Sequence, residues 1–451
     1  MELKADFIER TRLLFGEERY QRFLMALEKA PIVSVRYNEA KHCMPSDADK
    51  VSWASSACYL HERPMFTADP LFHAGCYYVQ EASSMFLEHV IKSYVDAPLC
   101  ALDLCAAPGG KSTHLLSSLP QGSLLVANEP LPLRAQVLAE NITKWGNPHA
   151  VVTRNEPRDF ALFRGMFDLI LVDAPCSGEG MFRKDAYAVE QWTQANVRQC
   201  AERQRQILSD VWDALRPGGL LVYSTCTFNR EENEDCVDWI AAELGAEVLP
   251  VEVPSDWGIT GSLTDNGAPV CRFIPGFTRG EGLFMALLRK NGSQSALQPR
   301  QQRIKPCTSK IKGIVASWIK DAEYYDFIMN NDMAVALPKK YTNIVMALQT
   351  KLKVLHAALP LAQIKNEKPI PHHAMAMSSV LNRDAFNSLQ VEREQALLYL
   401  HRESLTLPTA PIGFLLLTYR DVPLGFVKNV GNRANNMYPA DWRIRKNPME
   451  L

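Results

Sequence analysis

The chain has 451 residues, of which 47% are hydrophobic and 22% charged, a composition typical of a globular protein with two or three domains. Its apolar runs are shorter than the roughly 20 residues that cross a bilayer, and its first residues lack a secretory pattern, so we expect a cytoplasmic protein without a membrane partner. The net charge of −1 hides an asymmetry: residues 1–290 carry 28 basic and 38 acidic side chains, whereas residues 291–451 carry 21 and 12. A basic tail on an acidic body indicates a polyanionic partner such as a nucleic acid.

Residues 1–95 are predicted to form a small N-terminal domain that contacts the substrate. Its first fifteen residues have the pattern of an amphipathic helix, and "PIVSVRYN" (31–38) has that of a strand. The second half of the segment 71–91 has helical spacing, with four apolar side chains on one face: Met85, Phe86, Val90 and Ile91.

Residues 96–290 alternate short apolar runs with helical stretches, notably 131–145 and 189–215. This alternation predicts βαβ units around a parallel sheet. "RPGG" (216–219) is interpreted as a helix stop and a turn before the next strand.

The polar segment 291–306 is predicted to be a linker, and residues 307–451 form a basic C-terminal region. Its last apolar run, 411–431, has the pattern of a hairpin closed around Asp421–Pro423.

"LDLCAAPGGKST" (102–113) ends like a phosphate-binding loop, but Cys105 stands where such a loop needs its first glycine. The dinucleotide pattern G-x-G-x-x-G also fails, because no third glycine follows. What remains is a strand, a turn of small residues and a helix. Glu129 ends the next strand, where a carboxylate can accept hydrogen bonds from ribose hydroxyls. The pair fits a nucleoside without a pyrophosphate, such as S-adenosylmethionine; the alternative is a tight turn and a solvated Glu.

Two cysteines follow apolar runs in the same way, in "DAPCSGEGMFRKD" (173–185) and "YSTCTFNREENE" (223–234). Because the carboxyl ends of parallel strands share one edge of a sheet, Asp173, Cys176 and Cys226 are expected to face one crevice. For a single cysteine of this kind, burial in the core would be the better interpretation. Two such cysteines favour a catalytic role. The 11 cysteines form no C-x-x-C pair, so neither a metal nor a disulfide framework is expected.

Methyl transfer to carbon 5 of a pyrimidine needs such a thiol. A thiolate that adds to carbon 6 makes carbon 5 nucleophilic, which splits one difficult step into easier ones. The thiol needs positive surroundings to ionise, and Arg183, Lys184 or the helix start after Asn229 could supply them. Asp173 could hydrogen-bond nitrogen 3 and the exocyclic amine of a cytosine. The spacing alone leaves open which cysteine is the nucleophile.

The motifs "LDLCAAPGGKS", "DAPCSGEG" and "STCTFNREENE", in this order and spacing, resemble the NOL1/NOP2/Sun family of RNA 5-methylcytosine methyltransferases. "GCYYVQEASSM" and "GFVKNVGNRANNMYP" resemble its branch that methylates 16S rRNA, so the resemblance extends over nearly the whole chain. It implies a Rossmann-like class I S-adenosylmethionine-dependent methyltransferase core, a small N-terminal α/β domain and a C-terminal PUA-like RNA-binding region. It also implies rRNA, within or outside the small ribosomal subunit, as the partner of a monomer that does not act on DNA.

The resemblance also implies roles for matching residues. Cys226 is the nucleophile, Cys176 assists release of the methylated RNA, and Asp173 lies between cofactor and target base. Glu129 binds the ribose, and Glu156 is the expected acidic contact on the adenine side, with Asn155 and Asp159 as competitors. The loop that lines the S-adenosylmethionine site consists of Cys105, Ala106, Ala107, Pro108, Gly109, Gly110 and Lys111.

The target cytosine must leave its stack to meet Cys226. We expect the basic tail and Arg36, Tyr77 and Tyr78 to hold the backbone and flanking bases, although the tyrosines could equally pack in a core. Two other functions remain open: methylation of tRNA, and a non-catalytic RNA-binding role in ribosome assembly.

Overall fold

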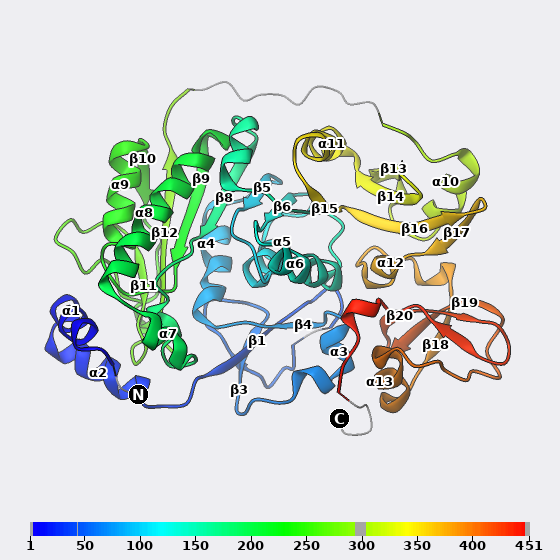
Figure 1. Cartoon of the computed structure of the whole chain (residues 1–451), viewed down its shortest axis with the longest axis horizontal. Helices are drawn as coiled ribbons and strands as arrows, with labels where there is room; N and C mark the ends of the chain where they lie inside the picture. The colour runs from blue at the N-terminus through cyan, green and yellow to red at the C-terminus, as the bar shows by residue number, and fades with distance from the viewer. Residues whose placement is uncertain (1–2, 43, 294–303, 447–451) are drawn as a thin grey trace.

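The structure, a computed structural model, describes residues 3–42, 44–293 and 304–446; most of the predicted linker 291–306 lies outside these ranges. The apolar runs of the middle of the chain form the largest sheet, and Figure 1 shows it at the centre and left of the molecule. In spatial order its strands are β10 (Ala246–Leu249), β12 (Leu283–Lys290), β9 (Leu215–Thr225), β8 (Phe167–Asp173), β5 (Cys100–Asp103), β6 (Leu124–Asn128), β7 (Ala150–Thr153) and β15 (Val354–Ala357), with β11 (Cys271–Phe273) beside β12.

Five neighbouring strands, from β9 to β7, are parallel, as the alternating pattern predicts. The sheet is antiparallel at both ends, which the predicted parallel sheet did not include. On one side β12 runs antiparallel to both of its neighbours, β9 and β10, and on the other side β15, which comes from beyond the predicted linker, runs antiparallel to β7. The C-terminal region therefore completes the central sheet, a pairing for which the short run "VLHA" carries no local signal.

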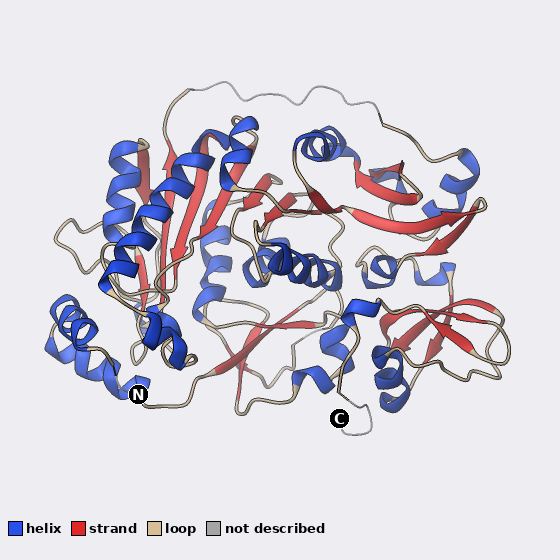
Figure 2. Cartoon of the chain, viewed as in Figure 1, coloured by secondary structure: helices blue, strands red, loops and turns tan. Residues whose placement is uncertain are grey.

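Helices cover both faces of this sheet (Figure 2). Alternate strand residues such as Leu102 and Val126 pack against one helix layer, and Ala101 and Leu125 pack against the other. The first layer contains α8 (Gln194–Val211), α9 (Glu234–Glu243) and α11 (Thr342–Lys351). The second contains α4 (Leu87–Tyr94), α5 (Gly110–Ser118) and α6 (Pro132–Trp145).

The predicted helix 189–215 is two helices, α7 (Ala186–Gln191) and α8, because the hydroxyl of Thr193 accepts the backbone N–H of Asn196 and begins a new helix there. The prediction of a turn at 216–219 is also wrong. α8 ends at Val211, and "RPGG" lies within β9, where the pairing with β8 shifts register. A β-bulge accommodates the proline and glycines that would otherwise interrupt a strand.

The N-terminal residues form two units. The first two helices, α1 (Ala5–Phe15) and α2 (Glu17–Leu27), pack through Phe7, Phe15 and Phe23 on Phe182 and Phe228 of the central domain. A small antiparallel sheet then covers α5 and α6, with α3 (Pro70–His73) beside it. Its strands lie in the order β2 (Asp49–Lys50), β3 (Ala57–Leu60), β1 (Val33–Tyr37) and β4 (Tyr77–Val79).

The C-terminal region contributes two further sheets, at the right of Figure 1. The first consists of β13 (Tyr325–Asn330), β14 (Met333–Pro338), β16 (Leu359–Lys365) and β17 (Lys368–Pro371), with α10 (Ser309–Ala316) and α12 (His373–Met377) nearby. The second consists of β18 (Asn387–Gln390), β19 (Gly413–Tyr419), β20 (Val422–Asn429) and β21 (Ala434–Asn436), with α13 (Arg393–His401). β19 and β20 form the predicted hairpin, and Arg420 and Asp421 both have positive φ in its turn.

Within the described residues, no helix combines the length and the apolarity that a membrane crossing requires.

A buried carboxyl, Asp103, ends β5 beneath the loop that leads to α5. Ser112 Oγ donates a hydrogen bond to its Oδ2 at 2.6 Å, whereas its buried Oδ1 has no hydrogen-bond partner among the described residues. Burial raises the pKa of Asp103 from 3.8 to about 7, because the low-dielectric interior penalises the charged form.

We expect Phe23→Ala to loosen α1 and α2 from the central domain. The Phe23 ring is fully buried, with its centroid 5.1 Å from that of Phe228, and such truncations cost about 3–5 kcal/mol. Faster hydrogen–deuterium exchange over residues 5–27 would report the change. Leu13→Ala, at an 87% exposed position, is the matched control and should leave exchange unaltered.

Asp103 predicts a pH dependence of stability. Because the folded protein binds this proton more tightly than the unfolded chain, the contribution of Asp103 to stability falls as pH rises from about 4 to about 7. Asp103→Asn should therefore flatten the fall of the melting temperature over this range, whereas Asp384→Asn, at an exposed position, should not. Identical pH profiles for Asp103→Asn and the wild type would contradict the assignment.

Candidate active site

The loop between β5 and α5 is held against two neighbouring strands. Ala106 N–H donates to Asn128 O at 2.8 Å, and the Asn128 side-chain amide donates to the carbonyls of Leu104 and Asn155. Gly109, at φ +115°, ends the loop; a side chain is strained there, and its Cβ would lie 3.3 Å from Leu138. Asn128 thus joins the ends of β5, β6 and β7 at the carboxyl edge of the sheet.

Lys111, in the first turn of α5, forms an ion pair with Asp173 at the end of β8. The Nζ–Oδ2 distance is 2.8 Å, and Ser224 Oγ donates to the other oxygen of Asp173 at 2.7 Å. Burial lowers the pKa of Lys111, but the charge and hydrogen bond of Asp173, together with the neighbouring Cys226 and Asp103, more than offset it and the pKa is raised. Lys111 therefore stays cationic and is turned to the interior of the site.

Glu129 follows β6 at the same edge, and its side chain is almost fully buried. Oε1 accepts the backbone N–H of Leu131 at 3.0 Å, and Oε2 lies 3.5 Å from Arg134, which also donates to the carbonyl of Ala107. The carboxylate is thereby held beside the loop 105–111, where the sequence places it.

The three residues after β7 that are candidates for the contact on the adenine side differ in what their side chains contact. Both side-chain groups of Asn155 bond the backbone of Lys353, just before β15, and Asp159 accepts the backbone N–H of Glu156 at 3.0 Å. Glu156 itself is exposed. Asn155 and Asp159 therefore have structural roles, and Glu156 shares a capping box with Asp159. The exposed Glu156 side chain stays the predicted ligand contact.

Cys176 and Cys226 meet at this edge, with their sulfur atoms 3.2 Å apart. The hydrogen bond to Cys226 and burial raise the pKa of Cys176 well above its ordinary value, so Cys176 keeps its hydrogen and donates it. Lys111 interacts electrostatically with Cys226, and this interaction contributes to the raised pKa of Lys111. Cys105, in the first loop, is half-buried, and burial of its thiol raises its pKa, which disfavours the thiolate that a nucleophile needs.

Two buried carboxylates join the cysteine loops reciprocally. Glu232, from the loop of Cys226, accepts the backbone N–H of Ser177 at 3.0 Å. Glu179, from the loop of Cys176, accepts the backbone N–H groups of Phe228 and Asn229 at 2.7 and 2.9 Å. Neither residue is among the predicted site residues. The sequence signal for them is an acidic residue shortly after each cysteine in the two motifs.

The loops also touch directly. Gly180 N–H donates to Cys226 O at 2.8 Å, and a Cβ at Gly180 would lie 2.9 Å from that oxygen. Only glycine permits this close approach.

The predicted cationic neighbours of the thiols lie elsewhere. Arg183 is buried in an ion pair with Glu281 at 2.9 Å, and Lys184 lies 3.7 Å from the same carboxylate. Both are held by Glu281, and the cation beside Cys226 is Lys111.

The predicted RNA contacts Arg36, Tyr77 and Tyr78 are also largely internal. Arg36 is 1% exposed, the Tyr77 hydroxyl donates to Asp69 at 2.7 Å, and burial raises the pKa of Tyr78 to about 12. Burial leaves Arg36 unavailable to an RNA backbone that crosses the protein surface, and the packing alternative is favoured for the tyrosines.

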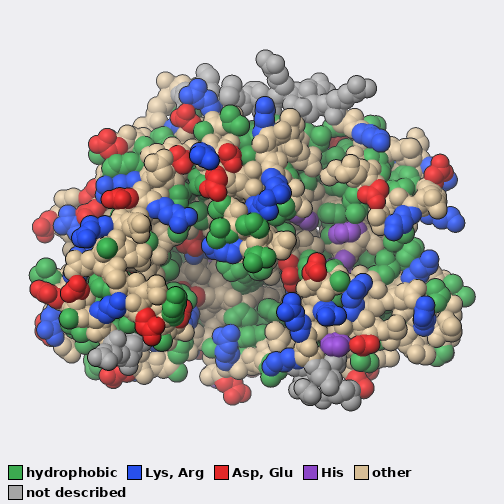
Figure 3. All heavy atoms as spheres, in the orientation of Figure 1, with side chains coloured by type: hydrophobic (Ala, Val, Ile, Leu, Met, Phe, Trp, Pro, Cys, Tyr) green, Lys and Arg blue, Asp and Glu red, His purple; other side chains and the backbone are tan. Residues whose placement is uncertain are grey.

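Figure 3 shows that this face of the molecule is hollowed below α5 and α6, between α7 and α3, with Lys and Arg side chains along one side of the hollow. α5 begins at the loop that precedes Lys111, and α7 follows the loop of Cys176. The hollow therefore lies beside elements that flank the candidate site.

Three segments match known protein families. Residues 96–289 match 16S rRNA methyltransferase RsmB/F, residues 3–82 match the N-terminal domain of 16S rRNA methyltransferase RsmF, and residues 386–444 match the methyltransferase RsmF PUA domain.

Among curated relatives, the chain is similar to ribosomal RNA small subunit methyltransferase F of several bacteria. The Pectobacterium atrosepticum protein is 28% identical over 97% of this chain and 95% of its own length. The Shewanella oneidensis protein is 32% identical over 81% and 79%, and the Shigella boydii protein is 31% identical over 82% and 78%.

Two solved structures from Pyrococcus horikoshii share the fold. A methyltransferase homologue is 25% identical and has a TM-score of 0.53 over 64% of this chain and 100% of its own. NSun6, solved with SFG, is 20% identical and has a TM-score of 0.52 over 64% and 99%.

The predicted Rossmann-like methyltransferase core and PUA-type region are confirmed, and S-adenosylmethionine is the cofactor of such a core. Because the chain covers more than two thirds of relatives that are 31–32% identical to it, it belongs to the NOL1/NOP2/Sun family of RNA methyltransferases, in the branch of the ribosomal small-subunit enzyme F.

Proposed function

We propose that the protein methylates carbon 5 of a cytosine in 16S rRNA through a covalent bond between the base and Cys226. The observation that carries the proposal is the pair of thiols, 3.2 Å apart, beside the Lys111–Asp173 ion pair. The curated relatives act, by their names, on ribosomal RNA of the small subunit, which supports this substrate over tRNA.

The residues around the first loop fit S-adenosylmethionine. The groups available to the ligand are the carboxylates of Glu129 and Glu156 and the backbone of a loop that a ligand can approach closely. Lys111 is held in an ion pair by Asp173 and so does not bind a phosphate. We assign binding of the cofactor to the loop Cys105–Lys111, with Glu129 at the ribose, Glu156 on the adenine side and Asp173 near the methyl group. When bound, S-adenosylmethionine supplies the methyl group that carbon 5 receives.

Cys226 is the proposed nucleophile, because the cation Lys111 interacts with it, whereas the pKa of its neighbour Cys176, 3.2 Å away, is raised well above its ordinary value. Its sulfur bonds to carbon 6 of the cytosine, and the electron pair of the 5,6 double bond becomes available at carbon 5. Asp173 would accept a hydrogen bond from the exocyclic amine, and a proton that it passes to nitrogen 3 would neutralise the negative charge that the addition brings into the ring. Carbon 5 would then bond to the methyl carbon while the bond between that carbon and the sulfonium sulfur of the cofactor breaks, with its electron pair going to the sulfur.

Release reverses the addition. A base removes the proton on carbon 5, the 5,6 double bond re-forms and the carbon–sulfur bond to Cys226 breaks. Cys176 is the proposed participant in this step, since its sulfur is within hydrogen-bond distance of the departing thiolate.

We propose that each of the predicted domains has its own role in RNA binding and methylation. Residues 1–95 contact the substrate, residues 96–290 carry the chemistry, and residues 307–451, with their excess of basic side chains, hold the RNA backbone. The PUA-type match over residues 386–444 supports the role of the last region.

Cys176→Ala should accumulate a covalent protein–RNA adduct, because addition by Cys226 proceeds while release is slowed. The adduct appears as a shifted band on a denaturing gel after incubation with S-adenosylmethionine and small-subunit rRNA. Cys226→Ala should form no adduct, and Cys200→Ala, a thiol on α8 away from the other two, should behave as wild type. An adduct with Cys226→Ala and none with Cys176→Ala would reverse the assignment of the nucleophile.

Bisulfite sequencing of rRNA from a deletion strain tests the product itself. A cytosine protected in the wild type and converted in the deletion strain is expected, and complementation with the gene should restore its protection. Unchanged conversion throughout 16S rRNA, together with no methyl incorporation in vitro, would favour a non-catalytic role in ribosome assembly.

A further inference from the structure

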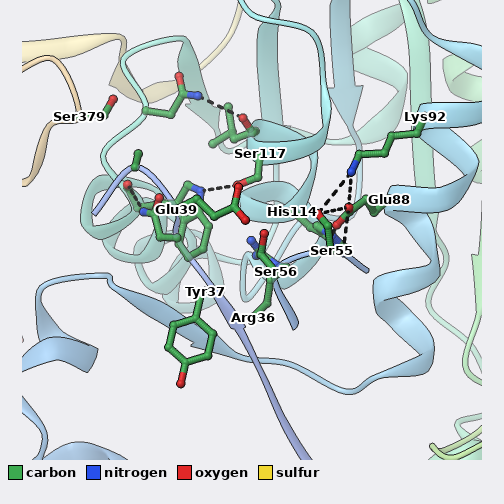
Figure 4. Close-up of a pocket in the computed structure, with 15 residues that line it drawn as sticks. Arg36, Tyr37, Glu39, Ser55, Ser56, Glu88, Lys92, His114, Ser117 and Ser379 are labelled. Atoms are coloured by element: carbon green, nitrogen blue, oxygen red, sulfur yellow. Dashed lines mark hydrogen bonds and ion pairs between the residues drawn. The ribbon is translucent and has the colours of Figure 1, made fainter. Parts of the chain in front are cut away.

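A polar pocket of about 290 Å³ lies behind the cofactor loop, outside the site described above (Figure 4). Its walls come from four parts of the chain: β1 and the residues that follow it, Ser55 and Ser56 before β3, the helices α4 to α6 with the residues just after α6, and Ser379 from the C-terminal region. Its volume is close to the lower limit of small-molecule pockets.

Arg36 contributes a guanidinium group that is only partly satisfied. Nε donates to Gln80, and Nη2 donates to Thr113 Oγ1 at 2.7 Å and to Gly110 O at 3.3 Å. Nη1 is buried and has no hydrogen-bond partner among the described residues. A buried donor without an acceptor is costly, so a ligand oxygen or ring nitrogen placed there would be stabilising.

His114, on α5, contributes the complementary group. Burial and the charge of Arg36 lower the pKa of His114 to about 4, so the ring is neutral at pH 7. Burial opposes ionisation of Glu88, but hydrogen bonds from His114, Lys92 and Ser55 outweigh it and lower the pKa of Glu88. Nε2 of His114 therefore carries the hydrogen and donates to Glu88 at 3.1 Å. Nδ1 is left as a buried acceptor, again without a partner in the described chain.

The chemistry of the pocket selects an uncharged ligand that both donates and accepts hydrogen bonds. Two cations, Arg36 and Lys92, and two carboxylates, Glu39 and Glu88, line it, so their formal charges cancel. A phosphodiester or a sulfate has only acceptors to offer the His114 nitrogen, and both carry a negative charge for which the pocket has no net positive charge. Every nucleobase, by contrast, carries a donor next to an acceptor on its Watson–Crick edge.

The walls also suit a flat ring. The Arg36 guanidinium lies 4.3 Å from the centre of the Trp145 ring, and both side chains line the pocket. Unpaired RNA bases are commonly recognised by aromatic rings or arginine planes together with hydrogen bonds to their edges.

We propose that this pocket binds an unpaired nucleobase of the RNA substrate other than the methylated cytosine, an inference that rests on the proposed function. Arg36 connects the pocket to the cofactor loop through Gly110, and His114 lies three residues, or about 5 Å of helix rise, beyond Lys111. An RNA whose target base reaches Cys226 therefore passes within a few nucleotides of the pocket. Binding of the second base fixes the register of the RNA.

Ser56→Phe tests the proposal by filling the pocket. Ser56 lines it, and the structure gives its hydroxyl no hydrogen-bond partner among the described residues, so the change adds bulk without removing a bond. Ser52→Phe, at an exposed position four residues earlier and outside the pocket, is the matched control. Melting temperature and S-adenosylmethionine affinity should match the wild type in both variants.

We expect Ser56→Phe to raise the KM for small subunits from a deletion strain about tenfold with kcat little changed, since stacking of one base contributes on this scale. Filter binding to a 16S rRNA transcript, which needs no catalysis, should show the same loss. Photocrosslinking of 4-thiouridine-substituted transcript to the wild type should label peptides that contain residues 36–40, 55–56 or 114–117. Equal RNA affinity of folded Ser56→Phe and Ser52→Phe, or crosslinks confined to other peptides, would overturn the proposal.

The two proposals fail separately. An absence of methyl incorporation by the wild type would remove the proposed function, whereas filter binding and crosslinking would still decide whether the pocket binds RNA. Normal methylation with unchanged KM in Ser56→Phe would remove the pocket and leave the proposed function intact.

Discussion

The site depends on the reciprocal hydrogen bonds of two buried carboxylates. Glu232 holds the backbone of one cysteine loop and Glu179 holds the backbone of the other, so neither loop can move without the loss of a buried hydrogen bond. Such bonds are strong where they are fully satisfied and costly to break. They explain how two thiols that are 50 positions apart in the chain remain 3.2 Å from each other.

The electrostatics of the site follow from this constraint. The two neighbouring sulfur atoms have different surroundings: Lys111 interacts with Cys226, whereas the hydrogen bond to Cys226 and burial raise the pKa of Cys176. The ion pair between Lys111 and Asp173 then has two consequences. It neutralises a partly buried cation, and it orients a carboxylate toward the position where the proposal places the target base.

The parts outside the core are attached through this same region. α1 and α2 pack on Phe228, two residues after Cys226, and Arg36 joins the N-terminal sheet to the first turn of α5. On the far side, β15 extends the sheet beside β7, and the preceding Lys353 holds Asn155. The regions proposed to bind RNA are thus in direct contact with the loops proposed to bind cofactor and base.

Much of this was predictable from local pattern. The alternation of apolar runs predicted the five parallel strands, and the rule that such strands share a carboxyl edge predicted the grouping of Asp173, Cys176 and Cys226. The missing glycine at Cys105 excluded a phosphate loop, and Lys111 is indeed held by a carboxylate. Where local pattern misled, as at "RPGG" or Arg183, a contact distant in sequence decided the outcome: the register shift against β8 in the first case and Glu281 in the second.

The sequence by itself therefore determined the alternation of strands and helices in the core and which loops share one edge of its sheet, because both follow from hydrophobic periodicity and chain topology. Only the tertiary structure decided which cation faces which sulfur, which acidic residues hold the loops, and that Arg36 is buried against Trp145. The physical reason is the separation in sequence over which each property is determined. Periodicity is encoded within a few residues, whereas the partner and the protonation state of a buried polar group depend on side chains brought together from dozens or hundreds of positions away.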